Sequence, residues 1–213
     1  LKSNIDYGVF EMGMDKKGEI ENLSKLVKPE IAIITNIGGA HFKNFNTLKD
    51  IAKAKAEIIN NIPNGGNVVL NKDSKFFRLL SHKAKKKGIN ITSFSLKKRS
   101  DIFLLGVKKI KNFFRLKINV RNKIFFFDTK YSTDNFVSNI LACISTIFIL
   151  NLDLNKIKKK FISFKIPEGR GDIKIIKKFN KRFKFIDESY NANPLSMISA
   201  INNMNYYNGK KNL

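Results

Sequence analysis

The stretch IAIITNIGGAHFKNFNTLKDIAKAKAEIINNIPNGGNVVL, residues 31–70, decides the fold class. Two continuous apolar runs, Ile31–Ile37 and Asn67–Leu70, flank a segment with helical periodicity from Thr47 to Ile62. Continuous apolar runs are typical of strands that are buried on both faces of a parallel sheet. An earlier run, Tyr7–Met12, has the same character. This alternation predicts an α/β fold, with a mostly parallel sheet flanked by helices.

The pattern changes beyond residue 90. Strands rich in Phe, Ile and Val occupy Asn90 to Asp128, and the polar pairs Lys111-Asn112 and Arg121-Asn122 interrupt them. Such spacing predicts antiparallel hairpins, which would form an edge of the sheet. Two helices are expected next, from about Asp134 to Leu150 and from about Asn155 to Phe164.

A break at residues 166–171 predicts a domain boundary, with one domain over residues 1–166 and the start of a second over residues 167–213. Beyond the break, Ile173–Lys177 and Phe183–Asp187 have the character of strands. Asn193 can cap a following helix, because Pro194 suits its first position. The helix would place apolar side chains at Leu195, Ile198, Ile201 and Met204. We therefore expect a second α/β unit to begin here.

Composition narrows the possible classes of protein. The chain has 213 residues, 43% of them hydrophobic, which favours a globular protein. Its net charge of +24 would ordinarily suggest nucleic acid or an anionic membrane. The basic residues are spread along the chain without an arginine-rich tract, so we expect no specific nucleic-acid partner.

The cysteine content and the hydropathy of the chain indicate the cellular compartment that we expect for this protein. Cys143 is the single cysteine, so no disulfide framework is possible, and we expect a core thiol in a reducing cytoplasm. The most hydrophobic stretch, Phe136–Leu150, is too short to span a bilayer core of roughly 30 Å. No signal peptide is visible. The chain begins at Leu1 without Met and ends in a turn-like sequence, so we expect both ends to be cut.

The helix predicted at Thr47–Ile62 carries the most informative lysine. At 100° per residue, Lys55 falls within the apolar stripe, whereas Lys53 and Glu57 point away. One reading is that Lys55 extends its amine out to solvent along its stem. The other is a desolvated amine, whose lowered pKa would let it act as a nucleophile or react with carbon dioxide to form a carbamate. The stripe itself comprises Leu48, Ile51, Ala52, Ile58, Ile59 and Ile62.

Two further side chains follow predicted strands. His41 lies shortly after Ile31–Ile37, and Glu11 ends the run that begins at Tyr7. Ligands of open α/β sheets bind at the carboxyl ends of the strands. Each residue alone is ordinarily a surface or hydrogen-bonded group. Together with a modified Lys55, they could form a divalent-cation site beside bound phosphate.

Polar side chains elsewhere could contact a nucleotide. Asn135 and Asn139 share one face near the start of the helix expected from Asp134. An Asn amide can pair with the N6 and N7 edge of adenine, although two polar surface residues beside a capping Asp134 are an equal alternative. Arg170, between Gly169 and Gly171, could reach a terminal phosphate from the predicted domain break.

In order and spacing, these segments resemble the central, ATP-binding domain of the Mur ligase family. The matching motifs are Glu11-Met12-Gly13-Met14, Gly18-Glu19-Ile20, Thr35-Asn36-Ile37-Gly38, Ala40-His41 and Ala54-Lys55-Ala56-Glu57-Ile58. The run Asp187-Glu188-Ser189-Tyr190-Asn191-Ala192-Asn193-Pro194 resembles the opening of the family's Rossmann-like C-terminal domain. The resemblance covers nearly the whole chain.

The resemblance implies an ATP-dependent reaction that adds D-alanyl-D-alanine to UDP-N-acetylmuramoyl-tripeptide during peptidoglycan synthesis, with Mg²⁺ as cofactor, in an enzyme that is monomeric at full length. Glu11 and His41 would face the Mg²⁺. Lys55, which follows His41 by 14 positions (55 − 41), would be the carbamylated lysine. The remaining implied roles are adenine contact for Asn139, γ-phosphate contact for Arg170, ribose contact for Glu188, and lining of the site between domains for Tyr190 and Asn191.

The sequence departs from the family pattern in three respects. Asp134 stands where many relatives have His, and Glu188 where many have a second Asp, which puts the adenine and ribose contacts in doubt. No G-x-x-x-x-G-K-[ST] phosphate loop occurs, since Gly209-Lys210 has Met204 at the position of the first glycine. We therefore expect the 213 residues alone to be inactive.

Two alternatives remain at this stage. One is another amide ligase of the superfamily, such as a folylpolyglutamate synthase, against which the run Tyr190–Pro194 argues. The other is a basic RNA-binding module, because aromatic residues alternate with lysines around Phe113–Phe127 and could stack on bases. Core strands explain these aromatic residues more simply.

Overall fold

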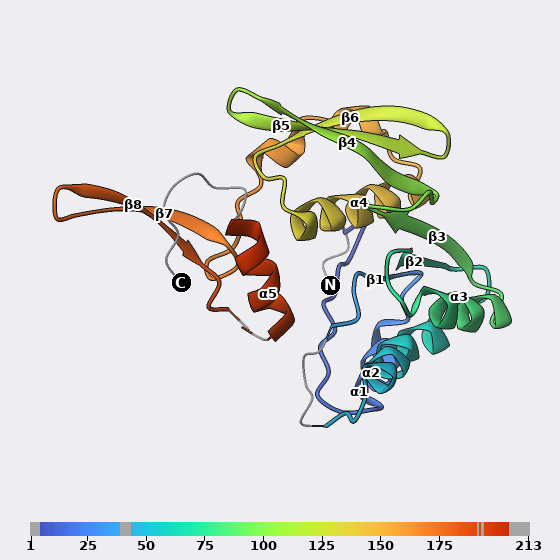
Figure 1. Ribbon diagram of the computed structural model, residues 1–213. Coiled ribbons are helices and arrows are strands. Elements are labelled where there is room, and N and C mark those ends of the chain that lie inside the picture. The colour runs from blue at the N-terminus through green and yellow to red at the C-terminus, as the bar shows by residue number, and fades with distance from the viewer. Residues whose placement is uncertain (1–4, 39–43, 191, 193, 205–213) are drawn as a thin grey trace.

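The computed structural model describes residues 5–38, 44–190, 192 and 194–204. Its main feature is a six-stranded sheet in which neighbouring strands follow chain order (Figure 1). The strands are β1 (Ile31–Ile34), β2 (Asn67–Asn71), β3 (Asn90–Ser95), β4 (Ile102–Ile110), β5 (Phe113–Val120) and β6 (Lys123–Thr129). The pairs from β1 to β4 are parallel, and β4, β5 and β6 are antiparallel. The predicted mixed sheet is confirmed.

Helices cover both faces of the parallel part. Alternate residues of β2 show this arrangement, because Val68 and Leu70 belong to one buried apolar cluster and Val69 to another. The first cluster includes residues of α1 (Glu19–Val27), α2 (Leu48–Lys55), the 3₁₀ helix η1 (Ala56–Asn61) and α3 (Phe77–Lys86). The second includes the inner side of α4 (Asp134–Ile149). Because successive side chains of a strand point to opposite faces of the sheet, β2 contributes to both apolar clusters.

The first predicted strand is wrong. No strand occurs in residues 5–14, and Val9 is 94% exposed. Among the described residues, β1 pairs only with β2, so that no strand formed by Tyr7–Met12 pairs with its free edge. An apolar segment becomes a strand only where another strand pairs with its backbone. The composition of the segment itself does not reveal whether such a strand lies beside it.

The hairpin prediction for Asn90–Asp128 is correct only from β4 onward. Strand β3 pairs in parallel with β2, because α3 carries the chain back before β3 begins. The two polar pairs do form the turns, since Lys111, Arg121 and Asn122 adopt positive φ angles of 42°, 45° and 69°.

Two smaller predictions also need correction. Two short 3₁₀ helices, η2 (Leu154–Ile157) and η3 (Lys160–Ser163), replace the single helix expected over Asn155–Phe164. Cys143 is exposed instead of buried, because it lies on the side of α4 that faces away from the sheet. None of the helices in the described part of the chain has the length and apolar character that crossing a bilayer requires.

A separate hairpin follows the larger sheet. Within the part of the chain that the structure describes, β7 (Asp172–Lys178) and β8 (Lys181–Asp187) pair only with each other, and they project away from the main sheet in Figure 1. Both predicted strands are confirmed. Helix α5 (Pro194–Asn203) begins at the predicted proline, whereas the proposed cap Asn193 lies outside the described residues. The boundary at residue 166 and a Rossmann-like second domain stay predictions.

Candidate functional site

The start of α2 is fixed by its own first residues. Thr47 precedes the helix and accepts a hydrogen bond from the backbone N–H of Asp50 at 3.2 Å. Its hydroxyl donates to the Asp50 carboxylate at 2.7 Å. This reciprocal cap confirms the predicted helix start and determines which residues of α2 face the sheet.

Lys55, the last residue of α2, is partly buried against the sheet. Its Nζ donates to the backbone oxygen of Asn36 at 3.2 Å. By contrast, the Lys53 side chain is 59% exposed and lies 3.9 Å from Asp50. The predicted difference between the two lysines is confirmed. Burial lowers the pKa of Lys55, so a larger share of its amine is neutral than in a solvated lysine.

The amine points toward the edge of the sheet at which the parallel strands end. Asn36 follows β1, and its Oδ1 accepts from the backbone N–H of Ile37 at 2.8 Å. Nearby, Asn71 at the end of β2 donates from Nδ2 to the backbone oxygen of Thr35 at 3.1 Å. The bond from Asn71 holds the ends of β1 and β2 together, at the sheet edge where α/β proteins bind their ligands.

The two predicted cation ligands differ in what the structure describes. Glu11 is exposed and does not end a strand, although Met14, three residues later, is buried in the core beside α1 and α2. His41 lies outside the described residues. Within residues 5–38, 44–190, 192 and 194–204, no three His, Cys, Asp or Glu side chains come close enough to hold a metal ion. The proposed pairing of Glu11 with His41 therefore stays a prediction.

The helical periodicity predicted that Glu57 points away from the core, and this prediction is wrong. Glu57 is only 8% exposed, because α1 packs against η1. Its carboxylate accepts from the backbone N–H groups of Gly18 and Glu21. A projection of one helix cannot reveal a second helix that packs against its outer side.

Asn135 and Asn139 lie in the first two turns of α4, and both are exposed. The predicted helix is confirmed, and its cap position is Thr133, one residue before Asp134. The Asn139 amide is accessible to a planar ligand with both donors and acceptors.

Arg170 lies in a turn that brings it to the end of β8. Its guanidinium carbon is 4.3 Å from the centre of the Tyr190 ring. The turn is bonded and not a loose break: Tyr190 N–H donates to the Gly169 oxygen at 2.9 Å, and Gly171 N–H to the Asp187 oxygen at 2.6 Å. The left-handed φ of 73° at Gly169 suits glycine, and a Cβ there would lie 2.9 Å from the Tyr190 Cβ.

Glu188 completes this second group of predicted residues. A Cβ on Gly171 would lie 2.9 Å from Glu188 Oε1, so glycine permits the close approach. Burial, followed by the neighbouring charges of Asp187 and Asp172, raises the pKa of Glu188. The structure thus brings Arg170, Glu188 and Tyr190 together, whereas Asn191 lies outside the described residues.

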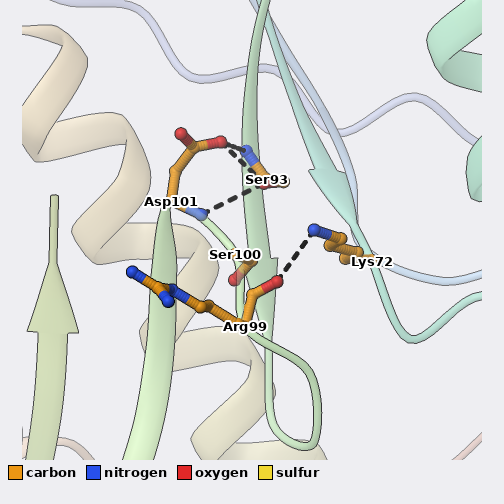
Figure 2. A pocket seen from close by; sticks show the side chains of 5 residues that line it. All are labelled: Lys72, Ser93, Arg99, Ser100 and Asp101. Atoms are coloured by element: carbon orange, nitrogen blue, oxygen red, sulfur yellow. Dashed lines mark hydrogen bonds between the residues drawn. The ribbon is translucent and has the colours of Figure 1, made fainter.

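A polar pocket that no sequence motif predicted lies between β2, β3 and β4. Its volume is about 410 Å³ and its lining comprises Lys72, Ser93, Arg99, Ser100 and Asp101 (Figure 2). Asp101 accepts from the Ser93 N–H at 2.8 Å and from the Ser93 hydroxyl at 2.6 Å, and Lys72 Nζ donates to the Arg99 oxygen at 2.8 Å. These bonds stabilise the connection between β3 and β4, and none of the predicted site residues that the structure describes lines the pocket.

Comparison with known proteins identifies the arrangement. Residues 1–147 match the family described as "Mur ligase middle domain". The UDP-N-acetylmuramoyl-tripeptide–D-alanyl-D-alanine ligase of Buchnera aphidicola subsp. Acyrthosiphon pisum is 36% identical over 212 residues, which cover 94% of this chain and 44% of that protein. The ligase of the same name from Rickettsia prowazekii is 31% identical and likewise covers 94% and 44%.

Solved structures agree with the sequence matches. A crystal structure of MurF from Acinetobacter baumannii superposes with a TM-score of 0.86 at 29% identity, covering 98% of this chain and 44% of that one. MurF from Thermotoga maritima in complex with ADP has the same fold, with a TM-score of 0.80 at 24% identity, covering 96% and 47%. The chain therefore spans less than half the length of these relatives. It belongs to the Mur ligase family, with the family's middle domain over residues 1–147.

Proposed function

We propose that this chain supplies the nucleotide-binding part of a ligase that adds D-alanyl-D-alanine to UDP-N-acetylmuramoyl-tripeptide in peptidoglycan synthesis. The observation that carries the proposal is the position of Lys55. This amine is partly buried, has a lowered pKa and points to the ligand-binding edge of the sheet in a chain 36% identical to a ligase of that name.

The proposed reaction transfers a phosphoryl group and then an acyl group. A carboxylate oxygen of the tripeptide attacks the γ-phosphorus of ATP, so that ADP leaves and an acyl phosphate forms. The amine of D-alanyl-D-alanine then attacks the acyl carbon, loses a proton and displaces inorganic phosphate. Mg²⁺ would neutralise charge on the phosphate oxygens during the first step.

Residues on the sheet edge would hold the cation and the phosphates. A neutral Lys55 amine can react with carbon dioxide to form a carbamate, which replaces a cation by an oxygen ligand. Glu11 would supply a carboxylate oxygen for Mg²⁺, which prefers oxygen ligands, and His41 would face the same cation.

The second group of residues would contact the rest of ATP. Arg170 would bind the γ-phosphate, since its guanidinium is exposed and stacked on Tyr190. Glu188 would contact the ribose, and Asn139 the adenine edge. Tyr190 and Asn191 would line the site between the two domains. The single cysteine fits a cytoplasmic enzyme, and a monomeric state is expected.

A chimera tests the proposal. Residues 1–147 would replace the corresponding part of the Acinetobacter baumannii relative, and phosphate release and peptide product would be measured with magnesium-ATP and the two proposed substrates. We expect activity that requires D-alanyl-D-alanine, is lost in Lys55→Ala and is partly restored by bicarbonate or a short carboxylic acid. Lys53→Ala is the matched control. An active chimera in which Lys53→Ala is the damaging change and Lys55→Ala is mild would refute the assignment.

A second candidate, a folylpolyglutamate synthase, rests on fold alone. The enzyme from L. casei has a TM-score of 0.64 at 17% identity. The same chimera assayed with a folate and glutamate distinguishes the two, because activity with that pair and none with D-alanyl-D-alanine would favour the second candidate.

A further inference from the structure

Glu57 is a buried carboxylate two residues beyond Lys55, and the proposed reaction assigns it no role. Both of its oxygens accept from the Gly18 N–H at 3.0 Å, and Oε2 also accepts from the Glu21 N–H at 3.3 Å. The residues lie 39 and 36 positions apart in sequence. Glu57 therefore joins the helical segment that bears Lys55 to a distant part of the chain.

The bonded partner is the start of α1, which has no cap of its own. Gly18 occupies the cap position with a φ of 92° and offers no side-chain acceptor. The first N–H groups of a helix lack partners within the helix and carry partial positive charge, so a carboxylate stabilises them. Glu57 supplies this cap from η1. Removing it would leave the Gly18 and Glu21 amides without their carboxylate.

The start of α1 is connected in turn to Glu11. Only six residues separate Glu11 from Gly18, and Met14 between them is buried in the core. Glu19 closes the intervening turn, because its Oε2 accepts from the backbone N–H groups of Asp15 and Lys16 at 2.6 and 2.9 Å. Hydrogen bonds thus link the Glu57 carboxylate to the start of α1 and close a turn that begins at Asp15, four positions after Glu11.

Other side chains also join η1 to Glu21, from the end of η1 that lies away from Lys55: Asn60 Nδ2 donates to Glu21 Oε2 at 2.5 Å and Asn61 Nδ2 to Glu21 Oε1 at 3.2 Å. Asn61 Nδ2 donates to the Glu21 oxygen at 3.2 Å and to Ser24 Oγ at 2.8 Å, and Lys87 Nζ donates to the Ile59 and Ile62 oxygens at 3.1 and 2.9 Å. They fix the end of η1 that lies away from Lys55. Glu57 lies in the first turn of η1, directly after α2 ends at Lys55.

We propose that Glu57 is a positioning residue, which holds the helix junction at Lys55 in register with the segment that carries Glu11. The proposal rests on the proposed carbamylation of Lys55. Glu57 contacts no substrate. It acts by keeping the Lys55 amine directed at the Asn36 oxygen, at the edge of the sheet.

Carbamylation can be measured without turnover. The 213-residue protein would be equilibrated with ¹³C-bicarbonate, and the ¹³C NMR signal lost in Lys55→Met would be followed against bicarbonate concentration. For Glu57→Ala we expect half-maximal signal to require about tenfold more bicarbonate, since a charge-assisted hydrogen bond no longer favours the positioned state. Glu57→Gln keeps an oxygen that can accept from Gly18, so an intermediate shift is expected.

Asp128→Ala is the matched control. Asp128 is also a buried carboxylate, 6% exposed, and Arg115 holds it through Nε at 2.7 Å and Nη2 at 2.9 Å on the far antiparallel part of the sheet. This change should leave the bicarbonate dependence unaltered. Equal shifts in Asp128→Ala and Glu57→Ala, or none in either Glu57 variant, would overturn the positioning role.

Two further outcomes separate the possible causes of failure. Absence of any Lys55-dependent carbamate in the parent protein would overturn the proposed role of Lys55 and, with it, the positioning role of Glu57. If Glu57→Ala fails to fold, Glu57→Gln decides the question together with hydrogen exchange at Gly18 and Glu21. Faster exchange at these amides with unchanged carbamylation would show that Glu57 only caps α1.

Discussion

Replacing Lys55 by methionine tests whether this lysine serves the fold or a reaction. Methionine keeps most of the length and apolar volume of the side chain but removes the amine. Among the described residues, the amine donates one hydrogen bond, to the Asn36 oxygen at 3.2 Å. Such a bond has a net value of about 0.5–1.5 kcal/mol, or up to about 3 kcal/mol when one partner is charged.

The lowered pKa of Lys55 adds a second contribution to the stability, opposite in sign to that of the hydrogen bond. Burial lowers this pKa, so the charged amine is less stable in the folded chain than in water. The loss of the hydrogen bond and the relief of the buried charge therefore oppose each other in Lys55→Met. We expect the free energy of unfolding at pH 7 to stay equal to that of the parent or to rise by up to about 1 kcal/mol.

The lowered pKa also predicts how the unfolding free energy changes with pH. Between the lowered folded pKa and the unfolded value of about 10.4, the unfolded state binds more protons at Lys55. The stability of the parent should consequently rise with pH in this window, relative to Lys55→Met, and any advantage of the variant should disappear above the unfolded pKa. Lys53→Met, at an exposed position, should change the unfolding free energy by no more than about 0.5 kcal/mol at any pH.

Urea denaturation of the parent and both variants at pH 7 and at pH 10.5 would measure these differences. In a protein of this size, 1 kcal/mol corresponds to roughly 2–4 °C in Tm, so thermal unfolding provides a second measurement. A loss of more than about 1.5 kcal/mol in Lys55→Met, independent of pH, would mean that the amine is a structural hydrogen-bond donor. The same pH dependence in Lys53→Met would refute the assignment to Lys55.

Three further outcomes are expected. Gly169→Ala should cost roughly 1–2 kcal/mol locally, because alanine disfavours the left-handed φ and its Cβ would lie 2.9 Å from the Tyr190 Cβ; hydrogen exchange at the Tyr190 amide should accelerate about 5–30-fold. In the active chimera, Glu11→Gln and His41→Gln should each raise the Mg²⁺ concentration needed for half-maximal rate with little change in Tm, whereas a large loss of stability at unchanged Mg²⁺ dependence would make them structural. The 213 residues alone should bind ATP only weakly and should not hydrolyse it, because they contain no phosphate loop. We expect titration calorimetry to give an affinity that falls steeply as the salt concentration rises. Turnover near the rate of the chimera would contradict this prediction.

Local sequence patterns predicted the elements whose determinants are themselves local. The periodicity of α2 predicted the buried side of Lys55 and the exposed side of Lys53, and Thr47 predicted the helix start. The positive-φ turn at Arg121-Asn122 and the proline at the start of α5 are likewise visible in a few consecutive residues.

The errors concern properties set by distant segments. Whether Tyr7–Met12 pairs as a strand, whether β3 runs parallel to its neighbour and whether Glu57 faces solvent all depend on what packs alongside. The approach of Arg170 to Tyr190 depends on the hairpin of β7 and β8, which returns the chain to its starting point. In the sequence, only the two glycines beside Arg170 indicate this tight turn, because a left-handed backbone with no room for a Cβ requires glycine.

The short pairing between β3 and β4 affects how the chain folds. These strands share only two register positions, Phe94 with Ile102 and Ser95 with Phe103, whereas the turns joining β4, β5 and β6 connect strands that pair along most of their length. Contacts close in sequence form early, so the three-stranded meander should be structured in the transition state before the parallel strands, whose crossovers close longer loops. Helix α4 is synthesised after both parts and packs against β2, β3 and β4. Its docking should be the late cooperative step that couples them, with φ-values that are high in the β4–β5 turn and low across the β3–β4 junction.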